Sequence, residues 1–433
     1  MHKLLFLILL LPSLLISQSV KGTFSPAEDF THAFLYQATP DGATYINHGK
    51  LDENGSFEIA LDSTAAPGIY KIVYAVPAEQ NNFDFIYDGK ENVAFNFNLE
   101  TGVEFTASEE NKLWTSYLNS MAMVNQTISN YYASNKDDKE GFNSIFKVAK
   151  DTQAAYEESA SGKIVSAFIS ANKPYLPNEY EDVSTYSQHL KDNFFSQIDF
   201  SNYMLQCSTF LVDRVVGYVF NIVENPNDST YKNLVNDVAN TISDDNAAIK
   251  TSILEILWQR FVSLDNHELA NYITDNYLLE LANKVGNIAM AEMLVSYKNT
   301  SIGALAPNFE IASTEATTSL HNLNGSQHYL LVFWSSGCGH CLNELPKLKE
   351  IVADKPDLKV VAFGLEDDPM NWSQEIKKYP EFIHTIGLGK WENKTVKTYG
   401  IAATPSYFLL DSSKLIVAKP YEFKDLEVIL SNL

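Results

Sequence analysis

The chain has 433 residues, 45% of them hydrophobic and 20% charged, which is typical of a globular protein with room for about three domains. Its formal net charge is −23, and no run of five or more basic residues occurs. Nucleic acid and anionic lipid are therefore excluded as partners, since both require Lys/Arg patches that neutralise phosphate.

The first 19 residues have the layout of a secretory signal peptide. A charged start at residues 1–3 precedes the apolar stretch 4–11, and small or polar residues follow at 17–19. Pro12 interrupts the apolar stretch, which is short for a membrane span of ~20 residues. We therefore expect cleavage near residues 17–19 and a mature protein in the periplasm. No lipid anchor is expected, because no cysteine lies near this site.

Residues 20–106 alternate between apolar and polar side chains in short runs, as strands do. Turn signals such as Pro40, Gly42, Gly55 and Gly68 separate the runs. Six or seven short strands at this spacing predict a small antiparallel β-sandwich or barrel. Nothing in this region points to chemistry. The predicted strands are 33–36, 45–48, 56–61, 69–74, 83–87 and 93–97.

Residues 107–300 change to helical periodicity. Leu113, Tyr117 and Met121 recur at four-residue steps, which places them on one apolar face of a helix. The region predicts an all-helical block of several antiparallel helices, and its aromatic residues are expected to form core. Cys207 lies in an apolar stretch of this block, so we expect a buried, inert thiol there.

In residues 301–433, after a short hinge at 302–309, strands and helices alternate. Strands are predicted at 329–334, 358–364, 406–410 and 415–417, and helices at 342–352, 371–378, 394–399 and 423–430. This order predicts an α/β domain with a mixed central sheet and helices on both faces. The predicted fold class is thus multidomain, with an antiparallel β domain, an all-α region and a C-terminal α/β domain.

The chemistry of the chain is concentrated in Cys338-Gly339-His340-Cys341, which stands between a predicted strand and a predicted helix. Two cysteines separated by two residues can close a reversible disulfide if a helix begins at the first one. A helix N-terminus presents unpaired N–H groups and positive dipole character, which favour a thiolate over a thiol. Such a site lowers a cysteine pKa from ~8.5 to roughly 3.5–7.5 and makes a nucleophilic sulfur available at neutral pH.

Metal and haem interpretations of the cysteine pair lack ligands. A four-coordinate zinc site would need a second Cys-x-x-Cys, and the remaining cysteine, Cys207, is remote in sequence. Covalent haem attachment needs a histidine after Cys341, where Leu342 stands. We therefore expect thiol–disulfide exchange with no metal, haem or other cofactor.

Several spaced motifs together resemble the thioredoxin superfamily. They are Trp334 before the cysteines, Pro346 in the following helix and Thr404-Pro405 before a strand. The entry at 306–309 and the run 341–346 are similar to the TlpA/ResA-type branch of secreted bacterial reductases. The resemblance covers residues 301–433. The upstream β and helical regions resemble accessory segments of such proteins in Bacteroidetes-type bacteria by their layout.

The resemblance implies roles for the matching residues. Cys338 would be the exposed nucleophile and Cys341 the resolving thiol, and together they would form the redox disulfide. Pro405 matches the family's cis-proline, so Thr404 would offer its backbone to an extended substrate. Trp334 would complete the substrate-binding surface. Protein disulfides would be the substrates, with a membrane-embedded thiol as electron donor.

Two further residues are candidates for tuning this chemistry. A partly protonated His340 between the cysteines would favour the thiolate and shift the couple toward an oxidant. Glu344, one helical turn after Cys341, matches an acid of the ResA-like branch and could accept the proton of Cys341. A passive exposed histidine and a solvated surface glutamate are the alternatives. Thioredoxin keeps a buried acid where this chain has Val332, so that role is not transferred.

The sequence favours a thiol–disulfide oxidoreductase that reduces or isomerises protein disulfides. Two alternatives stay open. In one, the β and helical regions bind a partner and the cysteine pair acts as a redox sensor. In the other, the protein is a thiol peroxidase, although Ser335 stands where that chemistry places a threonine. The direction of electron flow, the substrates and the oligomeric state are not predicted.

Overall fold

The computed structural model describes residues 18–134, 138–312 and 317–433, so the expected signal peptide lies outside the described residues except for Gln18 and Ser19. The chain forms two compact units. The first unit comprises the chain up to Asn227 together with Asn236–Ile249. The second unit comprises Asp228–Val235 and Lys250–Leu433. Within the described ranges, no helix is long and apolar enough to cross a membrane.

The first unit begins with two four-stranded sheets, in the orders β4-β1-β7-β8 and β3-β2-β5-β6. Inward-facing side chains of both sheets form one core that is rich in phenylalanine, including Phe24, Phe57, Phe85 and Phe95. The strands are β1 (Ser19–Ser25), β2 (His32–Thr39), β3 (Gly42–Lys50), β4 (Ser56–Ala60), β5 (Gly68–Val73), β6 (Asn82–Tyr87), β7 (Val93–Asn98) and β8 (Gly102–Ala107).

Two of these strands, β1 and β8, are absent from the predicted set. β1 pairs in parallel with β7, with Val20 opposite Val93, while the other pairs in the two sheets are antiparallel. A parallel pair joins strands that are distant in the sequence, so no hairpin turn signals it. β8 does alternate, with Val103 and Phe105 packed against the core and Glu104 between them exposed, so its pattern was a usable signal that the prediction missed.

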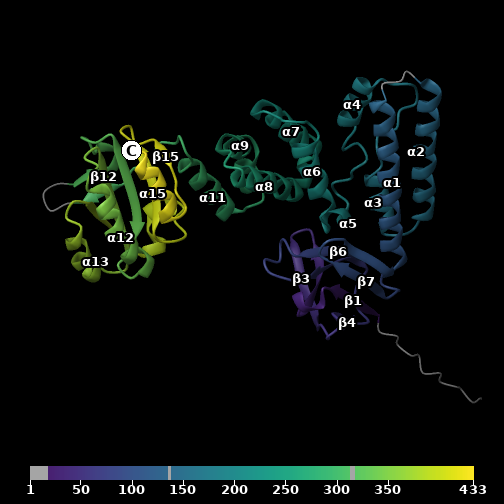
Figure 1. Ribbon diagram of the computed structural model, residues 1–433, viewed down its shortest axis with the longest axis horizontal. Coiled ribbons are helices and arrows are strands. Elements are labelled where there is room, and N and C mark those ends of the chain that lie inside the picture. Colours follow the sequence, from purple (N-terminus) through teal and green to yellow (C-terminus); the bar gives the residue numbers. More distant parts are fainter. Residues whose placement is uncertain (1–17, 135–137, 313–316) are drawn as a thin grey trace, which may run out of the picture. The chain divides into compact units, whose positions relative to one another are not determined.

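Helices follow the sheets in the first unit, beginning with the antiparallel pair α1 and α2 (Figure 1). The aromatic stripe predicted on the first helix is core, since Tyr117 and Met121 are buried. The α-helices between β8 and Asn227 are α1 (Glu109–Ala133), α2 (Lys139–Ser159), α3 (Val165–Ala171), α4 (Val183–Asp192), α5 (Tyr203–Gln206) and α6 (Phe210–Asn221). Cys207 directly follows α5 and is a free, buried thiol, and burial raises its pKa.

Glu110 connects α1 to the start of α3. Its buried carboxylate accepts hydrogen bonds from the backbone N–H groups of Ile164 (3.0 Å) and Val165 (2.7 Å). These donors lie at a helix N-terminus, where they have no partner within the helix. The carboxylate therefore supplies the acceptors that the local sequence of α3 does not.

Glu110→Ala should lower the free energy of unfolding of the first unit by about 1–3 kcal/mol, because it leaves two backbone donors unsatisfied. The measurement is the urea transition followed by far-UV circular dichroism. Glu109→Ala, at the neighbouring exposed position, should change it by less than about 0.5 kcal/mol. Equal effects of both substitutions would contradict the proposed capping role.

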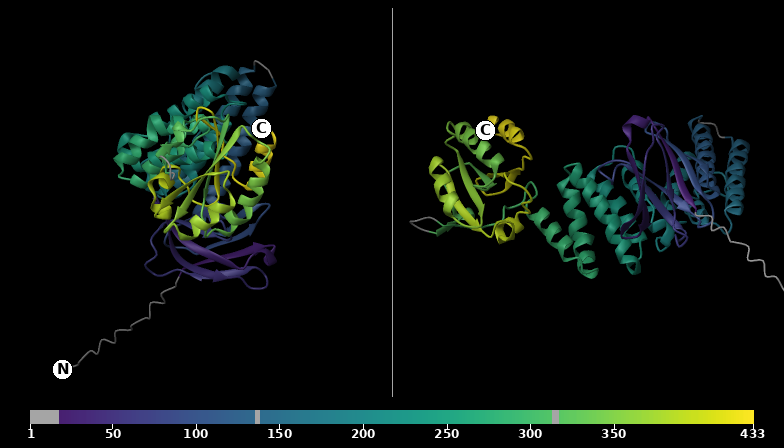
Figure 2. Two further views of the ribbon diagram at one scale, coloured as in Figure 1. Left: turned by 90° about the vertical axis from the view of Figure 1, so that its left-hand side faces the viewer. Right: turned by 90° about the horizontal axis from the view of Figure 1, so that it is seen from below.

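The second unit contains the helices α9 (His267–Ile273), α10 (Leu279–Lys284) and α11 (Ile288–Asn299). The helices α7 (Asp228–Thr241) and α8 (Ala247–Ser263) are shared by the two units. Ser296 of α11 donates a hydrogen bond to the carbonyl of Thr398 at 3.1 Å. These helices precede a five-stranded sheet in the order β13-β12-β11-β14-β15 (Figure 2).

The sheet is mixed, since β11 pairs in parallel with β12 and antiparallel with β14. The predicted fold class, with a thioredoxin-like C-terminal domain, is confirmed. The elements are β9 (Glu310–Ala312), β10 (Thr317–Ser319), β11 (His328–Trp334), α12 (Gly339–Val352), β12 (Leu358–Glu366), α13 (Met370–Glu375), β13 (Ile383–Leu388), α14 (Lys394–Thr398), β14 (Ser406–Asp411), β15 (Ile416–Ala418) and α15 (Phe423–Ser431).

The central strand β11 is buried on both faces, which explains its uninterrupted apolar sequence. Leu330, Val332 and Trp334 pack in the core that contains α12 and α15. Leu331 and Phe333 point the other way and pack with Tyr399, which directly follows α14. This anchors the end of β11, and hence the cysteine loop that follows it.

Several features of this domain differ from the sequence prediction, including the short strands β9 and β10, which were not predicted. The segment 302–309 is not a free hinge, because Ala306 and Phe309 are buried in the domain core and the N–H of Ala306 donates to Lys414 O at 3.0 Å. β13, which pairs in parallel with β12, is absent from the predicted strands. Its short sequence includes His384, Thr385 and Gly387 and lacks a continuous apolar run.

Candidate active site

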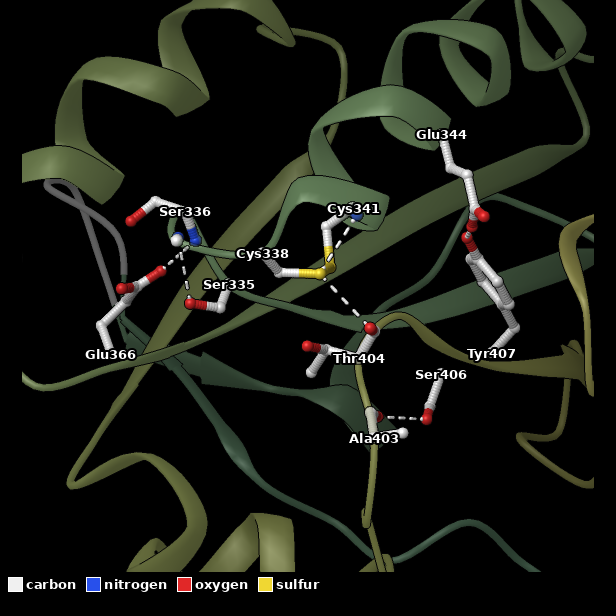
Figure 3. The surroundings of a disulfide bond; sticks show 11 residues. Ser335, Ser336, Cys338, Cys341, Glu344, Glu366, Ala403, Thr404, Ser406 and Tyr407 are labelled. Atoms are coloured by element: carbon white, nitrogen blue, oxygen red, sulfur yellow. Dashed lines mark hydrogen bonds between the residues drawn. A yellow bond between two sulfur atoms is a disulfide. The ribbon is translucent and has the colours of Figure 1, made fainter.

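Cys338 is the N-cap residue of α12, and its sulfur takes the place of the usual capping oxygen. The backbone N–H of Cys341 donates a hydrogen bond to Cys338 Sγ over 3.1 Å (Figure 3). A hydrogen bond from a helix N-terminus stabilises a negative charge on that sulfur. The local geometry therefore favours the thiolate of Cys338 when the protein is reduced.

The two cysteines form a disulfide, with their Cα atoms 5.3 Å apart. Cys341 is fully buried in the core between α12 and the sheet, whereas Cys338 is half-buried and His340 exposed. A molecule that approaches from solvent can therefore reach Cys338 but not Cys341. This difference distinguishes the two sulfurs chemically.

The loop before β14 faces the cysteines. The Thr404–Pro405 peptide bond is cis, and the carbonyl oxygen of Thr404 lies 3.3 Å from Cys338 Sγ (Figure 3). Ser406 Oγ donates to the carbonyl of Ala403 at 2.7 Å and so fixes the loop from within. The structure thus brings Thr404 and Pro405 together with the cysteine pair, 63 or more residues away in sequence.

A groove with a volume of about 680 Å³ runs along this loop. Its walls include His340, Glu344, Thr404 and Pro405, and its far side is formed by residues 419–424. Tyr421 in that segment is 91% exposed. The groove is open to solvent, and it includes Thr404, whose carbonyl lies beside Cys338.

Trp334 is placed differently from its predicted contact with substrate. Its side chain is fully buried among the residues that surround Cys341, beneath the surface that a substrate would meet. As the last residue of the central strand β11, it points into the core with the alternation of that strand. Its position is that of a packing residue under the cysteines.

Glu344 lies on α12 and accepts a hydrogen bond from the hydroxyl of Tyr407, over 2.6 Å (Figure 3). Tyr407 is buried, and burial together with the neighbouring carboxylate raises its pKa strongly. The phenol therefore stays protonated and remains a donor at neutral and moderately alkaline pH. Tyr407 was not predicted as a residue of the site, because the sequence analysis placed it only within the strand after Pro405.

Tyr407→Phe should lower the free energy of unfolding by about 1.5–3 kcal/mol, the usual range for a hydrogen bond to a charged group. The measurement is the urea midpoint and slope at neutral pH. In a Glu344→Ala background the same substitution should cost clearly less, because its acceptor is gone. An equal cost in both backgrounds would contradict a direct Tyr407–Glu344 interaction.

Glu366 is a buried acid beside the cysteine loop, and it was not predicted from the sequence. Its Oε1 accepts the backbone N–H of Ser336 at 2.5 Å (Figure 3). Ser335 contributes a second constraint, since its Oγ accepts the N–H of Gly337 at 3.2 Å. Glu366 ends β12, the strand parallel to β11, and the carboxyl ends of parallel strands meet at one sheet edge. Ligands bind at this edge in open α/β sheets, so its position was a usable signal.

Within the described part of the chain, no group of three or more His, Cys, Asp or Glu side chains is arranged to hold a metal ion. The site offers one accessible sulfur at a helix start, one buried sulfur and a neighbouring groove. This is the arrangement of a thioredoxin-like dithiol site, which exchanges disulfides with a partner.

Comparison with known proteins agrees with this class. Residues 301–429 match the family Redoxin, so the C-terminal region is a Redoxin domain. Thiol-disulfide oxidoreductase ResA of Bacillus cereus is 26% identical over 146 residues, which are 33% of this chain and 82% of ResA. Thiol:disulfide interchange protein DsbE of Xylella fastidiosa is 26% identical over 121 residues, 27% of this chain and 58% of DsbE.

Solved structures from Bacteroides species are also similar to parts of the chain. A thioredoxin-like protein from Bacteroides caccae has a TM-score of 0.40 and 18% identity, and the match covers 60% of this chain and 97% of that one. A thiol-disulfide oxidoreductase from Bacteroides fragilis has a TM-score of 0.27 and 22% identity, with 30% and 98% covered.

Proposed function

We propose that the protein is a secreted, periplasmic thiol–disulfide oxidoreductase that reduces or isomerises protein disulfides through Cys338 and Cys341. One observation carries the proposal: Cys338 caps α12 with its sulfur and is accessible, while Cys341 is fully buried one turn along the same helix. The kinship of the C-terminal region with thiol–disulfide oxidoreductases supports it.

The reaction proceeds in two exchanges. The Cys338 thiolate attacks a disulfide of the partner, forms a mixed disulfide and releases one partner thiolate. The Cys341 thiolate then attacks Cys338 Sγ, releases the second partner thiolate and closes the Cys338–Cys341 disulfide. Two electrons pass from the dithiol to the partner. A membrane-embedded thiol donor returns the site to its reduced form.

The other groove residues have supporting roles in this proposal. The backbone of Thr404, next to Pro405, pairs with an extended segment of the partner and aligns its disulfide with Cys338. Glu344 accepts the proton of Cys341 before the second exchange, with Tyr407 holding its carboxylate in place. A protonated His340 adds a positive charge beside the nucleophile.

The direction of electron flow is tested by the reduction potential of the Cys338–Cys341 couple. The protein is equilibrated in glutathione buffers of graded ratio, and the reduced fraction is trapped by alkylation and counted by mass spectrometry. A reductase or isomerase should give a value between ~−270 and ~−180 mV. A value near ~−120 mV, as in a strong oxidant, would contradict the proposal.

A further inference from the structure

A cavity of about 270 Å³ lies within the helical part of the first unit. Its walls come from four segments that are far apart in the sequence: α1, the residues after α3, α4 with residues 193–194, and α6. None of its residues belongs to the dithiol site. A cavity with walls from several helices is a usual setting for a small-molecule site.

The charged side chains that line this cavity are basic, whereas the chain as a whole is acidic. Lys173 and Arg214 line it, and its lining contains no Asp or Glu, although the chain has 54 acidic and 31 basic residues. Lys173 is paired with Glu157 at 3.1 Å. Among the described residues, no carboxylate forms an ion pair with Arg214, and Tyr117 is the group that acts on its charge.

Phe194 makes two contacts with the guanidinium group of Arg214. Arg214 Nη2 donates to the carbonyl of Phe194 at 3.0 Å, and Arg214 Cζ lies 4.1 Å from the centre of the Phe194 ring. A guanidinium has five N–H donors. The Nε–H is buried without a hydrogen-bond partner in the described structure, so these contacts leave donors unused. Burial also lowers the pKa of Arg214, since desolvation disfavours its charge.

The remaining walls combine apolar and polar side chains. Met121, Ile128 and Leu190 supply hydrocarbon surface, while Asn125 and Ser129 add hydrogen-bonding groups on α1. Burial of a charged arginine without a carboxylate partner costs desolvation free energy. An anion that accepts hydrogen bonds from the planar guanidinium group offsets that cost. Apolar walls favour an anion that also carries a hydrocarbon body.

We propose that this cavity binds a small organic carboxylate, whose anionic group pairs with Arg214 and whose apolar body lies against Met121, Ile128 and Leu190. The volume suits a molecule of about ten non-hydrogen atoms or fewer. The site is independent of the cysteine pair, and it gives the helical region a ligand of its own.

The test is a ligand-observed NMR titration of the full-length protein with phenylacetate and with its neutral amide, phenylacetamide. The carboxylate should bind saturably and at least about tenfold more tightly than the amide, because only the carboxylate makes a charge-assisted pair. Arg214→Met should remove this preference. The matched control Arg260→Met, at the exposed arginine of α8, should keep it.

Equal binding of carboxylate and amide to the unsubstituted protein, or no saturable binding of the carboxylate, would overturn the proposal. The comparison needs no variant, so it decides the matter even if Arg214→Met does not fold. Retention of the preference by a folded Arg214→Met protein would also overturn it.

Discussion

Cys338→Ser should abolish the reduction of insulin disulfides, with the rate falling to that of the reaction without protein. A serine hydroxyl is not ionised at neutral pH, so the helix N-terminus then has no nucleophile to stabilise. Insulin precipitation with dithiothreitol as the electron source measures the rate. This substitution has the largest effect that the structure predicts on activity.

Cys341→Ser should fail in a different way. The first exchange remains possible, but no buried thiol is left to release the partner, so a mixed disulfide should accumulate on Cys338 and be visible by mass spectrometry. Cys207→Ser is the matched control, because this thiol is buried elsewhere and the activity should stay unchanged. Substantial turnover by Cys338→Ser would show that the dithiol does not carry the activity.

Phe333→Ala should lower the free energy of unfolding of the second unit by about 3–5 kcal/mol, the usual cost of removing a buried phenyl ring. Phe333 is fully buried in β11, and its ring lies 4.8 Å from that of Tyr399 and 5.2 Å from that of Phe363. Because β11 leads into the cysteine loop, activity should be lost at lower urea concentrations. Urea unfolding followed by far-UV circular dichroism measures the change.

The control for this substitution is Tyr421→Ala. Tyr421 is 91% exposed, so its loss should change the free energy of unfolding by no more than about 0.5 kcal/mol. If Phe333→Ala had as small an effect, the description of β11 as the doubly covered centre of the sheet would be wrong.

Much of the catalytic domain could be predicted because its signals are local. The apolar run that ends at Trp334 predicts a buried strand, and the structure has β11 there. The helix predicted at 342–352 is also present, although it begins earlier, at Gly339, with Cys338 as its N-cap. These predictions depend on neighbouring residues, which a sequence displays directly.

The parts that were missed depend on contacts between distant residues. Glu366 reaches Ser336 from the adjacent parallel strand, and Tyr407 reaches Glu344 from β14, 63 residues further along the chain. The parallel pair of β1 with β7 is hidden for the same reason. Trp334 was recognised by its spacing, but spacing does not reveal that β11 turns its ring into the core.

Arg214 illustrates another limit of the sequence. Its neighbours Asp213 and Val215 give no sign that three other segments line a cavity with its side chain. The absence of a carboxylate partner among the described residues is a property of the packed helices, and it became visible only when the surrounding side chains were placed.

The central claim is that the start of α12 keeps the sulfur of Cys338 ionised at neutral pH. The most direct measurement is the rate of iodoacetamide alkylation of Cys338 in the reduced protein as a function of pH, with each labelled cysteine identified by mass spectrometry. We expect an apparent pKa for Cys338 well below that of a free cysteine, with rapid labelling already at mildly acidic pH. An apparent pKa near ~8.5, that of a free cysteine, would contradict it.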